Sequence, residues 1–202
     1  MRTTHRLFVA SAIALLSASS FALPSVWTTP DDHVDATHSY LENFNAFGES
    51  DAAVSAGNGY GFTASAIGDT YFNLGALSTN KNYVALTLDF TGADVHALRG
   101  KFFATDYDGT FFQSVTYFEF TLSNNSVEKF EGKALVEGGI TGFYSSLAIK
   151  KLTFSVEDGT FDLGQYAAID DLQVGAVPEP SSVALLGLGL AGVAFARRRR
   201  AA

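Results

Sequence analysis

Three groups of oxygen-bearing side chains have the types that a calcium ion prefers. One group lies in the turn sequence Asp-Tyr-Asp-Gly at 106–109, and the other two lie in the first and last predicted strands, 39–44 and 166–174. Calcium takes about six to eight hard oxygen ligands, and a sandwich of sheets brings its first and last strands together. The turn alone lacks the third carboxylate and the later Glu of an EF-hand loop. The candidate calcium ligands are Glu42, Asn43, Asp106, Asp108, Asp170 and Asp171. The alternative for each is a solvated turn or a hydrogen-bonded side chain.

Other reactive patterns are weak. His33 and His38, with Asp35 between them, have poor zinc spacing, and no H-E-x-x-H motif occurs. The sequence has no Cys and no G-x-S-x-G motif, so it offers no thiol or hydrolase-type serine nucleophile. Glycoside cleavage needs a carboxyl whose pKa is raised by burial, and no residue pattern marks one. We predict a protein without enzymatic activity, with a secreted glycan or ester hydrolase as one alternative.

Aromatic side chains raise a different possibility. Trp27 lies near the start of the chain, so we expect no tryptophan platform in the sheet for stacking on sugars. Tyr107, Tyr117 and Tyr144 could stack on sugars in place of a tryptophan. The alternative is that these tyrosines pack in the core or at its rim. A calcium-stiffened, lectin-like module is therefore a second alternative.

Alternating apolar residues predict the elements that must position these side chains. Beyond 39–44, strands are expected at 83–90, 98–104, 112–122, 127–136, 152–156 and 166–174. Turns are expected at 57–61, 68–70, 106–109, 124–125 and 157–159. The apolar residues Ile169 and Leu172 change face, which indicates a bulge. No amphipathic helix of twelve or more residues is evident between 23 and 175. We predict an all-β antiparallel sandwich or jelly roll, and the uneven strand lengths disfavour the alternative of a β-barrel.

The two ends of the chain differ from its middle. Residues 1–22 combine Arg2 and Arg6 with an apolar stretch and a small-x-small sequence, as in a signal peptide cleaved after Ala22, with Ala18 as the fallback. Residues 23–176 then form one domain. Only one of the twenty-one Asp and Glu residues lies outside it, against six of the thirteen Lys and Arg residues, so its net charge is −13. So acidic a domain is not expected to bind nucleic acid. Without Cys, it must depend on core packing or bound metal.

Residues 177–202 form a tail of three parts. Pro178, Glu179 and Pro180 cannot continue a sheet or a helix, because proline fixes φ and lacks a backbone donor. The apolar run 183–196 spans about 21 Å as a helix, short of the roughly 30 Å of a bilayer core. Arg197, Arg198, Arg199 and Arg200 would stop transfer and keep the end cytoplasmic. The G-x-G-x-x-G at 187–192 follows no strand and is not read as a nucleotide site.

This order of breaker, apolar segment and basic cluster resembles the PEP-CTERM sorting tail. The resemblance implies a membrane-embedded exosortase and the secretion machinery as partners, transient anchoring in the inner membrane of a Gram-negative bacterium, and release to the cell surface or extracellular matrix. It also implies association with exopolysaccharide in biofilms. An unprocessed single-pass anchor is the alternative.

A second resemblance concerns the domain itself. The sequences at 105–109, 142–144, 151–154 and 168–172 resemble segments of domains found ahead of PEP-CTERM tails. The closing Ile169-Asp170-Asp171-Leu172 is similar to the last strand of jelly-roll carbohydrate-binding modules. In those modules an Asp of this strand often joins the first strand at a structural calcium, which would give Asp170 or Asp171 that role here. No other cofactor is expected.

Overall fold

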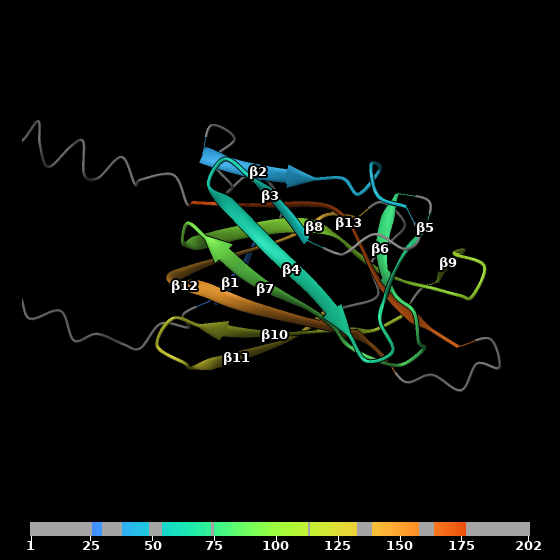
Figure 1. Ribbon diagram of the computed structural model, residues 1–202. Coiled ribbons are helices and arrows are strands. Elements are labelled where there is room, and N and C mark those ends of the chain that lie inside the picture. The colour runs from blue at the N-terminus through green and yellow to red at the C-terminus, as the bar shows by residue number, and fades with distance from the viewer. Residues whose placement is uncertain are drawn as a thin grey trace, which may run out of the picture.

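The computed structural model describes residues 26–29, 38–48, 54–73, 75–112, 114–132, 139–157 and 164–176. Within these ranges the chain forms antiparallel strands and no α-helix (Figure 1). None of the described segments is a helix that could cross a membrane. The predicted signal peptide with Ala22, the segment of His33 and Asp35, and the tail from 177 to 202 lie outside the described residues.

The strands form two layers. The first layer contains β3 (Val54–Gly57), β4 (Tyr60–Ala66), β7 (Leu86–Gly92), β10 (Thr116–Leu122) and β11 (Val127–Gly132). The second layer contains β1 (Val26–Thr29), β2 (Ser39–Glu42), β5 (Thr70–Asn73), β6 (Ala76–Thr79), β8 (Val95–Thr105), β9 (Phe111–Phe112) and β13 (Tyr166–Gly175).

One long strand, β12 (Thr141–Val156), belongs to both layers. Its first part pairs with β1 and β8, and its last part pairs with β7 and β10. All hydrogen-bonded strands therefore form one continuous sheet that folds back on itself. This arrangement agrees with the predicted all-β antiparallel sandwich.

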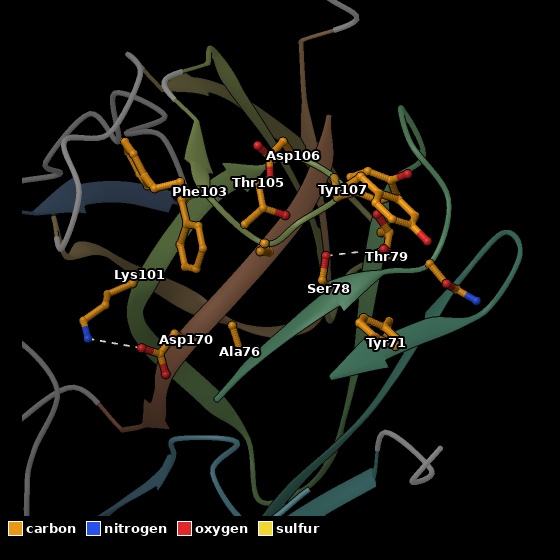
Figure 2. A pocket seen from close by; sticks show the side chains of 15 residues that line it. Tyr71, Ala76, Ser78, Thr79, Lys101, Phe103, Thr105, Asp106, Tyr107 and Asp170 are labelled. Carbon is orange, nitrogen blue, oxygen red and sulfur yellow. Dashed lines mark hydrogen bonds and ion pairs between the residues drawn. The ribbon is translucent and has the colours of Figure 1, made fainter. Parts of the chain in front are cut away.

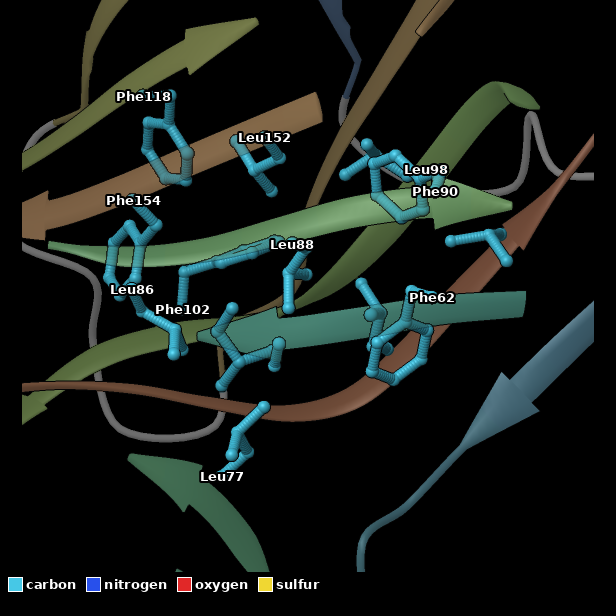
Figure 3. Close-up of a cluster of buried hydrophobic side chains, with 14 of the residues drawn as sticks. Phe62, Leu77, Leu86, Leu88, Phe90, Leu98, Phe102, Phe118, Leu152 and Phe154 are labelled. Carbon is cyan, nitrogen blue, oxygen red and sulfur yellow. The ribbon is translucent and has the colours of Figure 1, made fainter. Parts of the chain in front are cut away.

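The core lies between the layers and is rich in phenylalanine (Figure 3). Phe102 of β8 is fully buried, and its ring centroid lies 5.2 Å from that of Phe118 on β10 and 5.4 Å from that of Phe154 on β12. Burying such a side chain contributes about 1.5–3 kcal/mol. In β10, and in β8 from Leu98 to Ala104, every second residue enters this core and its neighbours point outward.

Several predicted strands are confirmed with shifted ends. The alternation of Phe118, Phe120 and Leu122 against outward neighbours is as expected, but this strand begins only at Thr116. Phe112 belongs instead to the separate β9, which pairs with β8. The strand predicted from 83 begins at Leu86, because Tyr83 has a left-handed φ of 56°. The turn at 106–109 is confirmed by the hydrogen bond from Gly109 N to Asp106 O, 3.1 Å.

The N-terminal half is more regular than its sequence indicates. It contains β1 to β6, of which the sequence predicted only β2. Four of the other five have four residues each, too few to show periodicity. Of these four, β1 and β6 pair with the distant strands β12 and β13, and β3 and β5 pair with the strand that follows each of them. The expected turn at 57–61 is shorter, since Tyr60 and Gly61 already belong to β4. Trp27 does belong to the sheet, because it lies in β1 and pairs with Tyr144 in β12.

Candidate functional site

A groove of about 570 Å³ lies on the outer face of the second layer (Figure 2). Its floor and walls come from β5, β6, β8, β9, β13 and the turn after β8. The residues that line it are Tyr71, Ala76, Ser78, Thr79, Asn80, Lys101, Phe103, Thr105, Asp106, Tyr107, Gly109, Phe111, Tyr166, Ala168 and Asp170.

The hollow arises from one row of side chains across four strands. Tyr71 of β5 pairs with Ser78 of β6, Ser78 pairs with Ala168 of β13, and Ala168 pairs with Phe103 of β8. Cross-strand partners stand side by side on one face of a sheet. The row therefore runs large, small, small, large, with an aromatic ring at each end and a hydroxyl and a methyl group between them.

One end of the groove is aromatic. Tyr166 of β13 pairs with Thr105 of β8, which pairs with Phe111 of β9. The rings of Phe103 and Phe111 lie 6.1 Å apart, between centroids. Tyr107 stands on the turn beside this end and is 79% exposed. A phenol this exposed on a turn is available to a ligand.

The turn that carries Tyr107 is held by its own carboxylate. Asp106 Oδ1 accepts hydrogen bonds from the backbone N–H groups of Asp108, at 3.0 Å, and Thr110, at 2.9 Å. Gly109 completes the turn with a φ of 80°, which favours glycine. The carboxylate of Asp106 therefore serves the turn itself, and Asp108 contributes its backbone N–H group to the same turn.

The other end of the groove is charged. Lys101 Nζ lies 3.2 Å from Asp170 Oδ2 and 2.5 Å from Asp171 Oδ2. Successive residues of a regular strand point to opposite faces, yet both carboxylates reach the same lysine. The predicted bulge explains this, because the register of β13 against β8 shifts between Asp170 and Gln173 and Asp171 has a φ of 49°. Hydrogen bonds to Asp171 and then to Asp170 raise the pKa of Lys101.

The remaining candidate ligands lie at the open edge of the sandwich. Glu42 of β2 pairs with Leu172 of β13, so the first and last predicted strands do meet. The carboxylate of Glu42 accepts hydrogen bonds from Tyr40 OH at 2.6 Å, from Ser55 Oγ, and from Phe44 N at 2.9 Å. The side chain of Asn43 is exposed, and its Oδ1 accepts the N–H of Asn45.

Burial raises the pKa of Glu42, but the hydrogen bonds from Ser55, Tyr40 and the backbone outweigh it and leave this pKa below its ordinary value. The oxygens of Glu42 are thus held by protein donors, and those of Asp170 and Asp171 by Lys101. In the described ranges no three His, Asp or Glu side chains gather as a metal site. As arranged, these residues do not fit a calcium ion, and calcium binding stays a prediction that would require these contacts to open.

Sequence reasoning found part of the groove. The strand predicted at 98–104 contains Lys101 and Phe103, and Tyr107 was offered as a residue that could stack on sugars; all three line the groove. Tyr117 and Tyr144, named with Tyr107, do not line the groove. Sequence reasoning missed Tyr71, Ser78 and Ala168, since only strand pairing brings them beside Phe103.

Comparison with known proteins found similar solved structures and one matching family model. Nine solved chains match it. One is a family 29 carbohydrate-binding module, with 14% identity over 67% of this chain and 83% of that one and a TM-score of 0.41. A second family 29 module, complexed with mannohexaose, has 17% identity over 67% and 89% and a TM-score of 0.40. The CBM22-1 xylan-binding domain of Paenibacillus barcinonensis Xyn10C has 14% identity over 74% and 99% and a TM-score of 0.36.

No protein of curated function matches the chain. The family model of the PEP-CTERM protein-sorting motif matches residues 176–200. That match covers the Pro-Glu-Pro sequence, the apolar run and the four arginines, directly after the last strand of the sandwich. The chain therefore carries a PEP-CTERM protein-sorting motif, which indicates an exported protein processed by an exosortase.

Proposed function

We propose that this exported protein binds a polysaccharide in the groove of its sandwich and acts without catalysis at the cell surface or in the extracellular matrix. One observation carries the proposal: the row in which Tyr71 and Phe103 flank the small residues Ser78 and Ala168. Aromatic rings on both sides of a floor of small residues suit a flat, hydroxyl-rich ring.

The chemistry of the lining supports a sugar. Pyranose rings present apolar C–H faces and polar hydroxyl edges. The aromatic rings of the groove offer the apolar surface, and Asn80, Lys101 and Asp170 offer hydrogen-bonding groups at its margin. A volume of about 570 Å³ lies within the usual range for ligand sites, roughly 300–1,000 Å³. An open groove rather than a closed cavity accepts a segment inside a longer chain.

The ionisable groups of the groove favour binding over turnover. Glycoside cleavage needs one carboxyl that stays protonated near neutral pH beside a second that is ionised. Here Asp170 is ion-paired with Lys101, and Asp106 accepts hydrogen bonds from two backbone N–H groups, so both carboxylates already have partners within the protein. Neither is arranged as a general acid.

The sorting motif supports the place of action. We propose that the tail anchors the protein briefly in the inner membrane of a Gram-negative bacterium, that an exosortase cleaves near Pro178, and that the released domain joins exopolysaccharide in a biofilm. Binding in the groove would then hold the domain in the polymer after release.

The test is binding of the full chain, purified in mild detergent, to a glycan array and to insoluble polysaccharides. We expect at least one polysaccharide to bind, and Tyr71→Ala and Tyr107→Ala each to weaken that binding about tenfold, equivalent to about 1.4 kcal/mol. Tyr117→Ala is the matched control, because Tyr117 is a 40% exposed tyrosine on β10 outside the groove.

Equal loss in all three variants, or no binding by the unmodified chain, would contradict the proposal. Sugar release from any bound polysaccharide, measured in the same samples, would favour the hydrolase alternative instead.

A further inference from the structure

We infer that the groove selects neutral glycans and excludes glycans that carry carboxylates or sulfates. The inference deepens the proposed function and rests on it. Its basis is the pairing of Lys101 with two neighbouring aspartates at the charged end of the groove.

The groove has no unneutralised positive charge among the residues described. Lys101 is the single basic side chain in its lining, against the two acids Asp106 and Asp170. Asp171, just outside the lining, gives Lys101 a second carboxylate at 2.5 Å. These four groups together have a net charge of −2, within a predicted domain of net charge −13. An anionic polymer therefore meets repulsion both at long range and inside the groove.

The ammonium group of Lys101 already has two carboxylate partners, Asp170 and Asp171. Its side chain is 30% exposed, and the side chains of Asp170 and Asp171 are 25% and 39% exposed. A glycan carboxylate that accepted the remaining N–H donor of Lys101 would lie beside the carboxylates of Asp170 and Asp171, and their negative charges would repel it.

A neutral sugar can bind the same pair without breaking it. An ammonium group has three N–H donors, and a carboxylate accepts at both oxygens. With Lys101 Nζ at 3.2 Å from Asp170 Oδ2, one sugar hydroxyl can accept from Lys101 while its neighbour donates to Asp170. Vicinal hydroxyls supply this donor and acceptor together. The pair therefore recognises a diol, and the row from Tyr71 to Phe103 supplies the stacking next to it (Figure 2).

The experiment compares neutral polysaccharides (glucan, mannan and xylan) with acidic ones (alginate, polygalacturonate and a sulfated galactan) by affinity electrophoresis of the full chain in detergent. We expect at least one neutral polysaccharide to bind ten times more tightly than any acidic one. In the double variant Asp170→Asn with Asp171→Asn, Lys101 loses both partners, and we expect binding of the uronate polymers to rise about tenfold and to become salt-dependent.

The matched control is Glu128→Gln with Glu131→Gln, which changes the net charge by the same amount on β11, outside the groove lining. An equal gain in the control would mean that overall charge, not Lys101, excludes acidic glycans. If the double aspartate variant does not fold, Lys101→Met tests the role of the ion pair independently. It should weaken neutral-glycan binding several-fold and leave acidic polymers unbound.

The outcomes separate the two proposals. Equal or tighter binding of acidic polymers by the unmodified chain would overturn the selectivity and leave polysaccharide binding intact. An unchanged uronate affinity in the double aspartate variant, or an unchanged neutral affinity in Lys101→Met, would overturn the role of the ion pair. Absence of any glycan binding would overturn the proposed function and this inference with it.

Discussion

The hydroxyl of Tyr40 on β2 donates a hydrogen bond of 2.6 Å to Glu42 Oε2 two residues along the same strand. Ser55 of β3 donates to the same oxygen. Since β2 pairs in the second layer and β3 in the first, this cluster joins the two layers at their open edge. The ring of Tyr40 lies against Gly57 of β3, where a Cβ would collide with it. The hydrogen bonds of Glu42 thus connect the two layers at the edge of the sandwich, and phenylalanine rings connect them at its centre.

Stability should fall in acid because of Glu42. Its pKa in the folded state lies below the ordinary value of about 4.3. A depressed carboxyl pKa stabilises the fold above the unfolded-state pKa, and this contribution is lost as the pH falls through the folded-state value. We expect the free energy of unfolding, from urea titrations, to decline below about pH 4.3, and Glu42→Gln to flatten that decline.

At neutral pH, Glu42→Ala should destabilise the fold by about 2–3 kcal/mol, because Tyr40, Ser55 and Phe44 N–H lose their acceptor. The control is Glu119→Gln, which removes an exposed ion pair with Lys129 and should cost less than about 1 kcal/mol. Similar losses in the two variants would show that the Glu42 cluster does not stabilise the edge.

Neighbouring phenylalanines on β8 should have separate effects. Phe102 is fully buried between the layers, so Phe102→Ala should cost about 3–5 kcal/mol of unfolding free energy. Phe103 lines the groove on the opposite face, so Phe103→Ala should cost about 1 kcal/mol but weaken polysaccharide binding. Thermal and urea unfolding with a binding assay on both variants tests this. A reversed order of destabilisation would mean that the register of β8 is wrong.

Calcium gives a further test of the arrangement around Asp170 and Asp171. Since Lys101 occupies both carboxylates, we expect millimolar calcium or EDTA to leave the melting temperature unchanged. A ligand that binds only the folded state raises stability in proportion to the logarithm of its concentration. A rise in melting temperature with calcium, reversed by EDTA, would instead support the calcium-stiffened lectin-like alternative.

Processing of the sorting motif can be followed by mass spectrometry of protein released from the surface of the producing cells. We expect a C-terminus near Pro178, without Arg197 to Arg200, and accumulation of the uncut chain in the membrane for Glu179→Ala. Glu157→Ala, an exposed Glu before the last strand, is the control. Released protein that still carries the arginines would indicate that no cleavage occurs.

The sequence alone was enough to predict the fold class and the export of the protein. Strict alternation in strands such as Thr116–Leu122 reports which face is buried, because that periodicity is local to each strand. The Pro-Glu-Pro sequence, apolar run and arginines are likewise contiguous, so the sorting motif is readable without any coordinates. The bulge near Asp170 was also visible, because the apolar residues change face within a few positions.

The groove could be found only in the tertiary structure, because strand pairing assembles its lining. Phe103 and Ala168 are far in the chain from each other and from Tyr71 and Ser78. The four form one row only because β5, β6, β13 and β8 pair in that order. Asp170 is a second example. The sequence indicated it as a candidate calcium ligand, and the fold places it opposite Lys101, with which it forms an ion pair. Strand order depends on long-range pairing and on core packing across the whole domain, and no local pattern of residues encodes it.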